Sequence, residues 1–180
     1  MNKSFPTVRR ASEADISLDR DVFVRELLRG LSGSLQDIIG LEEASGFISL
    51  VGQEIGQDLD RRYREALQLQ QLSRPQVADV LVDLKRRIEG DFYVIEESDE
   101  KIVFGNRACP FGGRVLERPA LCMMTSNVFG TIAAENLGYA KVSLEETIAG
   151  GGPGCRIVVY LRPTPQSEQA DGREYFQQTG

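Results

Sequence analysis

The sequence predicts an α+β fold in which N-terminal helices pack on one antiparallel sheet, in the order ααα-ββ-α-ββ. Apolar residues recur at helical spacing through most of residues 18–88, and the period then changes to strand-like alternation. A further helical stretch and two more strand-like segments follow. Because the strands are grouped instead of alternating singly with helices, we expect one sheet packed under helices. The 180 residues, 41% hydrophobic, suffice for one domain with a buried core.

Three helices are predicted in the first half of the chain, over residues 18–39, 41–69 and 73–90. A serine and a proline are suited to begin the third helix, and glycines are suited to end the first and third. Gly52 and Gly56 lie four residues apart and therefore on one helix face. They indicate close helix packing or, alternatively, space for a ligand or for a partner helix across a dimer interface.

Strands and one more helix are predicted in the second half. Residues 91–97 and 101–106 are short and rich in β-branched and aromatic side chains, which predicts a β-hairpin. Residues 119–136 have helical spacing after an initial proline. Residues 140–149 and 155–161 are strand-like and flank a GGGPG turn.

The domain organisation follows from polarity at the two ends. Residues 1–16 are polar and predict a flexible lead-in, residues 17–163 are predicted to form a single domain, and the polar residues 164–180 predict a disordered tail. Near the end of the third helix come Lys85 and two arginines, which we expect to be solvated cations at a helix terminus.

Composition excludes several classes of function. The net charge of −6 gives no overall electrostatic basis for direct nucleic-acid binding or for adsorption to a membrane surface. The chain has no histidine, so catalytic arrangements that need one are impossible, and we expect no enzyme. No apolar run reaches the length of a membrane span. Three cysteines are an odd number, which disfavours a secreted disulfide framework and predicts a cytoplasmic location.

The cysteines are the candidate site. Cys109, Cys122 and Cys155 each lie at the end of a predicted element, where metal ligands and reactive thiols are often found. If they converge, a fourth ligand must be a carboxylate, water or an exogenous molecule, and Glu145 and Glu146 are the nearest carboxylates along the chain. Three thiolates and a carboxylate suit zinc, whereas three thiolates with an open position suit an iron–sulfur cluster. The alternatives are a metal-free thiol redox sensor and three inert, buried cysteines.

Several runs resemble a known family. NRACPFGG, PALC and NLGYAKVSLEETIAGGGPGCRIVVYL, together with GLEEASGFISLVGQEIGQDLDRRYREAL, resemble the methanogen output domain, which is related to the 4-vinyl reductase domain. They are also similar to the C-terminal domains of iron–sulfur-binding repressors. The resemblance covers roughly residues 35–162 and implies a sensory domain that signals to a partner.

The resemblance also implies ligands. In the 4-vinyl reductase group a glutamate and three cysteines hold zinc beside a small-molecule pocket. Cys122 and Cys155 match two of these cysteines, and Glu145 or Glu146 falls near the glutamate. The remaining cysteine is absent, and Cys109 replaces it if the hairpin end folds toward the site. In the iron–sulfur repressors the third cysteine would fall near position 136, which is an asparagine here.

We therefore predict a small-molecule- or metal-binding sensory domain with a cysteine-lined site, zinc as its metal, a regulatory partner protein and a homodimeric state. The ligand pocket is expected between the second helix and the sheet, lined by Phe47, Phe104, Met124 and Phe129. The alternative function is a thiol-based redox sensor or a cysteine-dependent enzyme that works without histidine.

Overall fold

The fold was analysed in a computed structural model, which describes residue 17 and residues 19–178. The predicted lead-in of residues 1–16 lies outside the described residues. In chain order the elements are α1 (Arg20–Ile39), α2 (Leu41–Leu67), α3 (Arg74–Arg87), β1 (Phe92–Glu97), β2 (Lys101–Asn106), the 3₁₀ helices η2 (Gly112–Val115) and η3 (Pro119–Leu121), α4 (Cys122–Leu137), β3 (Tyr139–Glu146), η4 (Ile148–Gly150), β4 (Cys155–Tyr160), α5 (Pro165–Gln169) and β5 (Arg173–Phe176).

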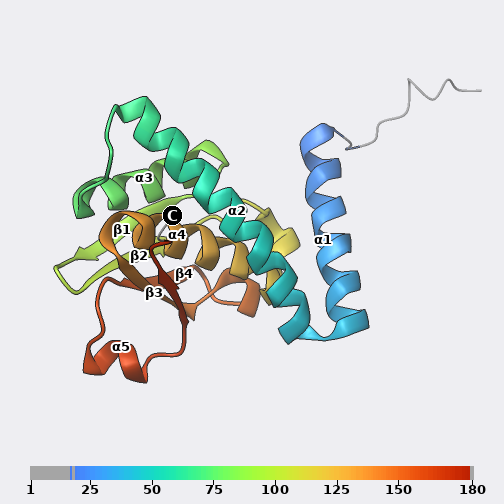
Figure 1. Cartoon of the computed structure of the whole chain (residues 1–180). Helices are drawn as coiled ribbons and strands as arrows, with labels where there is room; N and C mark the ends of the chain where they lie inside the picture. The colour runs from blue at the N-terminus through green and yellow to red at the C-terminus, as the bar shows by residue number, and fades with distance from the viewer. Residues whose placement is uncertain (1–16, 18, 179–180) are drawn as a thin grey trace, which may run out of the picture.

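The α+β prediction is confirmed. One five-stranded sheet has the order β1-β2-β4-β3-β5, and every neighbouring pair is antiparallel (Figure 1). β2 and β4 pair along their whole length, from Lys101 opposite Tyr160 to Asn106 opposite Cys155. This register sets the end of the first hairpin directly beside the start of β4.

Helices cover one face of the sheet in layers. α3 and α4 supply the main core against inward-facing residues of the strands, and α2 packs on α4. A Cβ atom on Gly52 would lie 2.8 Å from the Cβ of Asn127, and one on Gly56 would lie 2.9 Å from the Cβ of Thr131. The two glycines therefore allow α2 and α4 to approach closely. α4 lies between most of α2 and the sheet.

The opposite face of the sheet is covered by the C-terminal segment. Side chains alternate along β2 and β4, so Val103, Val158 and Tyr160 form a second buried cluster on this face. Ala170 packs against that cluster from the end of α5. For residues 164–178 the prediction of a disordered tail was therefore wrong, because strands that are apolar on both sides need a cover on both sides.

The last strand closes the sheet against β3. Tyr139 pairs with Phe176, and their rings meet edge to face with centroids 5.5 Å apart. Tyr175 points the other way, onto α4, where its ring lies against Gly130. Its hydroxyl group is 2.9 Å from the Oγ of Ser126. β5 thus packs on α4 through a position where any larger residue would clash.

A buried polar network joins α2, α4 and the loop before α3. Asp60 is 1% exposed, and its carboxylate accepts hydrogen bonds from Arg64 and from the Nδ2 of Asn136. The Oδ1 of Asn136 accepts a hydrogen bond of 2.7 Å from the backbone N of Leu72. Position 136, where the iron–sulfur repressors would have a cysteine, therefore serves internal hydrogen bonding here.

The first helix contributes little to the core. Figure 1 shows α1 at one side of the molecule, next to α2 and away from the sheet. Among its residues only Ser32 and Gly33 are buried. Large apolar side chains are exposed along α1 and the adjoining face of α2: Phe23, Leu27, Leu31, Ile38, Phe47 and Val51. None of the helices in the described part of the chain is both long and apolar enough to cross a membrane.

Candidate functional site

The three cysteines line one small cavity. Cys109 lies in the loop after β2, Cys122 is the first residue of α4, and Cys155 is the first residue of β4. The cavity has a volume of about 30 Å³, roughly the space of a single water molecule. Its other lining residues are Phe92, Asn106, Pro110, Phe111, Val115, Leu121, Thr125, Leu144, Thr147 and Ile157.

Sheet register and a fixed amide set the position of Cys155. Its Sγ accepts hydrogen bonds from the Nδ2 of Asn106 at 3.6 Å and from the backbone N of Ile148 at 3.5 Å. Asn106 is 3% exposed, and its Oδ1 in turn accepts a hydrogen bond of 3.1 Å from the backbone N of Ala108. The amide is therefore held with its donor directed at the sulfur.

Burial keeps two of the thiols protonated. It raises the pKa of Cys122 to about 12, and the neighbouring thiols add to that shift. Burial also raises the pKa of Cys109, against a smaller opposing effect of a backbone hydrogen bond from Phe111. All three cysteines are free thiols. At neutral pH, Cys109 and Cys122 are thus present as weakly reactive thiols, because the thiolate is the nucleophile and the metal ligand.

A buried lysine adjoins the thiols. Lys85 is 4% exposed, and its Nζ donates a hydrogen bond of 2.7 Å to the Oγ1 of Thr125. The Nζ also lies 5.2 Å from the ring centroid of Phe92 and 5.3 Å from that of Phe129. Thr125 and Phe92 both line the cavity, so the ammonium group lies directly behind these two lining residues.

The expectation that Lys85 is a solvated cation was wrong. Val77, Leu81 and Lys85 are spaced four residues apart, so they share the face of α3 that packs on the sheet. Burial lowers the pKa of Lys85 to about 8, and negative charge on the three cysteines opposes this shift. No carboxylate in residues 19–178 forms an ion pair with it. The helical spacing of Lys85 with Val77 and Leu81 was the feature of the sequence that indicated its burial.

The carboxylates predicted as metal ligands do not reach the cavity. The Oε2 of Glu145 pairs with the Nε of Arg156 at 2.9 Å, at the protein surface. Glu146 is exposed and lies beside Gly152. The residues on either side of the two glutamates, Leu144 and Thr147, do line the cavity.

A metal does not fit the site as it is arranged. Within the described ranges, no group of three Cys, Asp, Glu or His side chains is close enough to hold a metal ion. The cation already beside the thiols is the ammonium group of Lys85. Zinc and the iron–sulfur cluster therefore stay predictions of the sequence.

The four predicted pocket residues lie apart from the cavity. Phe47 is exposed on α2, and Met124 lies against Gly52 where α2 meets α4. Phe104 and Phe129 are fully buried in the main core, with ring centroids 5.2 Å apart. Phe129 comes nearest to the site, because its ring contacts the Nζ of Lys85.

A larger pocket of about 400 Å³ lies on the other side of one loop. It is formed between α1 and the end of α3, and it shares Pro110 and Phe111 with the cysteine-lined cavity. Its two arginines have acidic partners: Arg25 pairs with Asp21 and Glu89, and Arg87 pairs with Asp83. Two side chains thus separate the buried cavity from an open pocket under α1.

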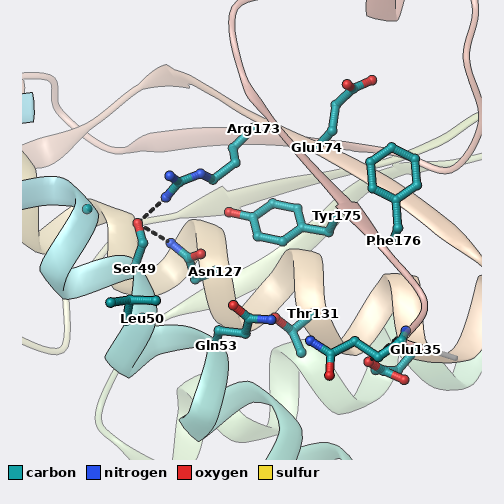
Figure 2. Close-up of a pocket in the computed structure, with 12 residues that line it drawn as sticks. Ser49, Leu50, Gln53, Asn127, Thr131, Glu135, Arg173, Glu174, Tyr175 and Phe176 are labelled. Atoms are coloured by element: carbon teal, nitrogen blue, oxygen red, sulfur yellow. Dashed lines mark hydrogen bonds between the residues drawn. The ribbon is translucent and has the colours of Figure 1, made fainter. Parts of the chain in front are cut away.

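A third pocket, of about 320 Å³, lies where α2, α4 and β5 meet. Figure 2 shows Asn127 and Arg173 both directed at Ser49, whose Oγ accepts a hydrogen bond from each. Because these polar groups satisfy one another across three elements, we interpret the cluster as structural. It was missed in the sequence because Arg173 lies in the segment predicted to be disordered.

Comparison with known proteins places these features in a family. The methanogen output domain 1 family matches residues 27–160. No curated protein matches the chain. Among solved structures, the phenol-responsive sensory domain of the transcription activator PoxR, bound to phenol, is similar with a TM-score of 0.60 and 18% identity, over 85% of this chain and 80% of that chain.

A second similar structure is a trafficking protein particle complex subunit 3 from Naegleria fowleri, covalently bound to palmitic acid. Its TM-score is 0.53 at 14% identity, over 87% of this chain and 99% of that chain. At these identities the two structures establish a shared fold. The family match spans well over half of the chain and agrees with the resemblance found in the sequence. This chain belongs to the methanogen output domain 1 family.

Proposed function

We propose that this chain is a sensory domain that binds a small molecule at the cysteine-lined cavity and reports the binding to a partner protein. The observation that carries the proposal is that thiols from three distant segments line one cavity, two side chains away from a pocket under α1. Membership of an output-domain family supports a regulatory role. The PoxR domain, which is phenol-responsive, supports a small aromatic compound as the first ligand to try.

The loop between Cys109 and Leu116 offers a route for the signal. On α1, the Nη1 of Arg29 donates a hydrogen bond of 2.9 Å to the backbone O of Leu116. From the loop, the Nη2 of Arg114 donates a hydrogen bond of 2.7 Å to the Oε1 of Glu26 on α1. A ligand that displaces this loop therefore pulls on α1 through paired polar contacts. Since α1 has little buried surface, its position responds at low energetic cost.

A homodimer is part of this proposal. Support comes from the apolar side chains exposed along α1 and α2, because contiguous apolar surface of this kind marks interaction sites. Light scattering on the full chain tests it: a mass of twice 20.0 kDa is expected, and a monomer at all concentrations contradicts it.

Thiol labelling tests ligand binding directly. At pH 8 we expect Cys122 to react with iodoacetamide more than about tenfold more slowly than in urea-unfolded protein, because burial keeps it protonated. Phenol is expected to slow the labelling of all three cysteines further and to raise the melting temperature. Labelling rates that no aromatic compound changes would contradict the proposal.

The metal and redox alternatives have separate readouts. Elemental analysis of anaerobically purified protein tests the predicted zinc, and its absorption spectrum tests the iron–sulfur alternative. A redox sensor would instead show reversible oxidation of its thiols by peroxide. The high pKa of Cys122 argues against rapid oxidation, because susceptibility follows thiolate character. We infer a sensor that binds its ligand without chemical change, and not an enzyme.

A further inference from the structure

A buried ammonium group without a counter-ion is the unexplained feature of the site. Lys85 is 4% exposed, and the one hydrogen-bond acceptor for its Nζ in the described part of the chain is the hydroxyl group of Thr125. Buried charges are normally paired, because removing an ion from water costs far more than a neutral hydrogen bond returns. The charge of this lysine would therefore stabilise an anion bound beside it.

In the described part of the chain, neither a carboxylate nor the thiols of Cys109 and Cys122 supply that anion. The other cations near the loop are paired, Arg25 with Asp21 and Glu89, and Arg87 with Asp83. The neighbouring Cys109 and Cys122 stay protonated, because burial raises the pKa of each. The carboxylate of Glu145, at the end of β3, is engaged by Arg156 at the surface.

The lining of the cavity defines the class of anion. Apart from Asn106, Thr125 and Thr147, its walls are carbon and sulfur. Such walls suit an apolar body that carries a single negative charge, whereas a phosphate or sulfate would leave several charged oxygens against apolar side chains. The cavity alone holds little more than one polar group, so the apolar body must extend past Phe111 toward the larger pocket under α1.

We propose that the cysteine-lined cavity binds a small organic carboxylate, whose negative group forms an ion pair with Lys85 and a hydrogen bond with Thr125. This assignment rests on the proposed sensory function and names its ligand class. Lys85 is then the residue that determines specificity, and the thiols form the apolar wall behind the bound group. Neutral molecules of the same shape leave the ammonium group unpaired and bind more weakly.

Benzoate and benzamide form a matched pair of probes, because they have nearly the same shape but benzoate carries a negative charge and benzamide is neutral. Calorimetric titration of the full-length chain at pH 7 is expected to show benzoate binding at least about tenfold more tightly than benzamide. Lys85→Met keeps the length and apolar stem of the side chain and is expected to abolish this preference. Lys101→Met, at the opposite end of β2, is the control and is expected to retain it. Circular dichroism verifies that both variants fold.

Proton uptake gives a second readout. Near pH 8 part of the Lys85 population is neutral, so a bound carboxylate should draw a proton onto it. Titration at pH 8 in two buffers of different ionisation enthalpy is expected to show uptake of a fraction of a proton by the wild-type chain. Lys85→Met is expected to show none.

The outcomes separate this inference from the proposed function. Equal binding of benzoate and benzamide, or a charge preference that survives in Lys85→Met, overturns the carboxylate assignment. If phenol protects the thiols while benzoate does not bind, the sensory proposal stands and the carboxylate assignment falls. If neither compound binds, both fall.

Discussion

Two buried charges in this domain have opposite surroundings. Asp60 is enclosed by α2 and α4, where Arg64 neutralises it and Asn136 donates a further hydrogen bond. Lys85 is enclosed by α3, α4 and the sheet, where a hydroxyl group and two aromatic rings face it but no carboxylate in residues 19–178 pairs with it. The fold pairs the first charge with an opposite charge. For the second, the described residues supply no carboxylate, and the proposed ligand would supply one.

The contrast separates a structural charge from a functional one. A paired buried charge is expensive to break, because removing one partner leaves the other unsatisfied. An unpaired buried charge is expensive to keep, and a fold that retains it is less stable than it could be. The four experiments below test this contrast, in order of decreasing effect on stability.

Asp60→Ala should have the largest effect. It leaves Arg64 without its partner and removes an acceptor from Asn136, which is 2% exposed. We expect a loss of about 3 kcal/mol in the free energy of unfolding, measured by urea denaturation. The Arg64 side chain is 34% exposed and can turn to solvent, which limits the loss. A loss below about 1 kcal/mol would mean that this network is no more structural than a surface ion pair.

Lys85→Met should act in the opposite direction. Without a bound ligand we expect it to stabilise the domain by roughly 1 kcal/mol, since it removes a buried charge and keeps the apolar stem. Thermal unfolding of the ligand-free chain measures this. Destabilisation of similar size would show that the lysine holds the fold together and would remove the contrast with Asp60.

The pH dependence of the same pair of proteins sharpens the test. Burial lowers the folded-state pKa of Lys85 from 10.5 to about 8, so the cost of the charge is fully present below pH 8. Between about pH 8 and pH 10.5 the unfolded chain binds more protons than the folded one, and stability rises with pH. The advantage of Lys85→Met should therefore shrink across that interval. Cys109, Cys122 and Cys155 face the lysine in both proteins, so the difference between the two curves reports Lys85 together with its charge coupling to Cys109 and Cys122.

Asp58→Ala should have the smallest effect on stability and serves as the control for Asp60→Ala. Asp58 lies on α2 two residues before Asp60, but it pairs with Arg61 and Arg62 at the surface. We expect a change of less than about 0.5 kcal/mol, because solvent screens exposed ion pairs. A change as large as that of Asp60→Ala would show that position on α2, and not burial, governs the result.

Periodicity made most of the fold predictable. Helical spacing identified α3 and α4, and short runs rich in β-branched and aromatic residues identified β2 and β4. The secondary structure of the C-terminal segment was missed because most of its residues are polar and show no apolar periodicity. Its role depends on what it covers, namely Val158 and its neighbours on the far face of the sheet, and that requirement arises only once the strands are paired.

The candidate site was predictable only in part. That Cys109, Cys122 and Cys155 end three separate elements indicated a common location, and the β2–β4 register provides it. The role of Lys85 was missed because lysine is usually solvated, and its place on an apolar stripe was outweighed by two arginines that follow it. The four aromatic and methionine side chains of the predicted pocket could not be told from ordinary core residues by sequence.

The position of β5 beside β3 has a consequence for shortened forms of the protein. Strand β3 gains its outer neighbour from residues 173–176. Removal of these residues would leave the backbone N–H and C=O groups along the outer edge of β3 unpaired, and an unpaired strand edge is a template for pairing with another chain. A chain shortened before residue 173 should therefore aggregate more readily than the full chain.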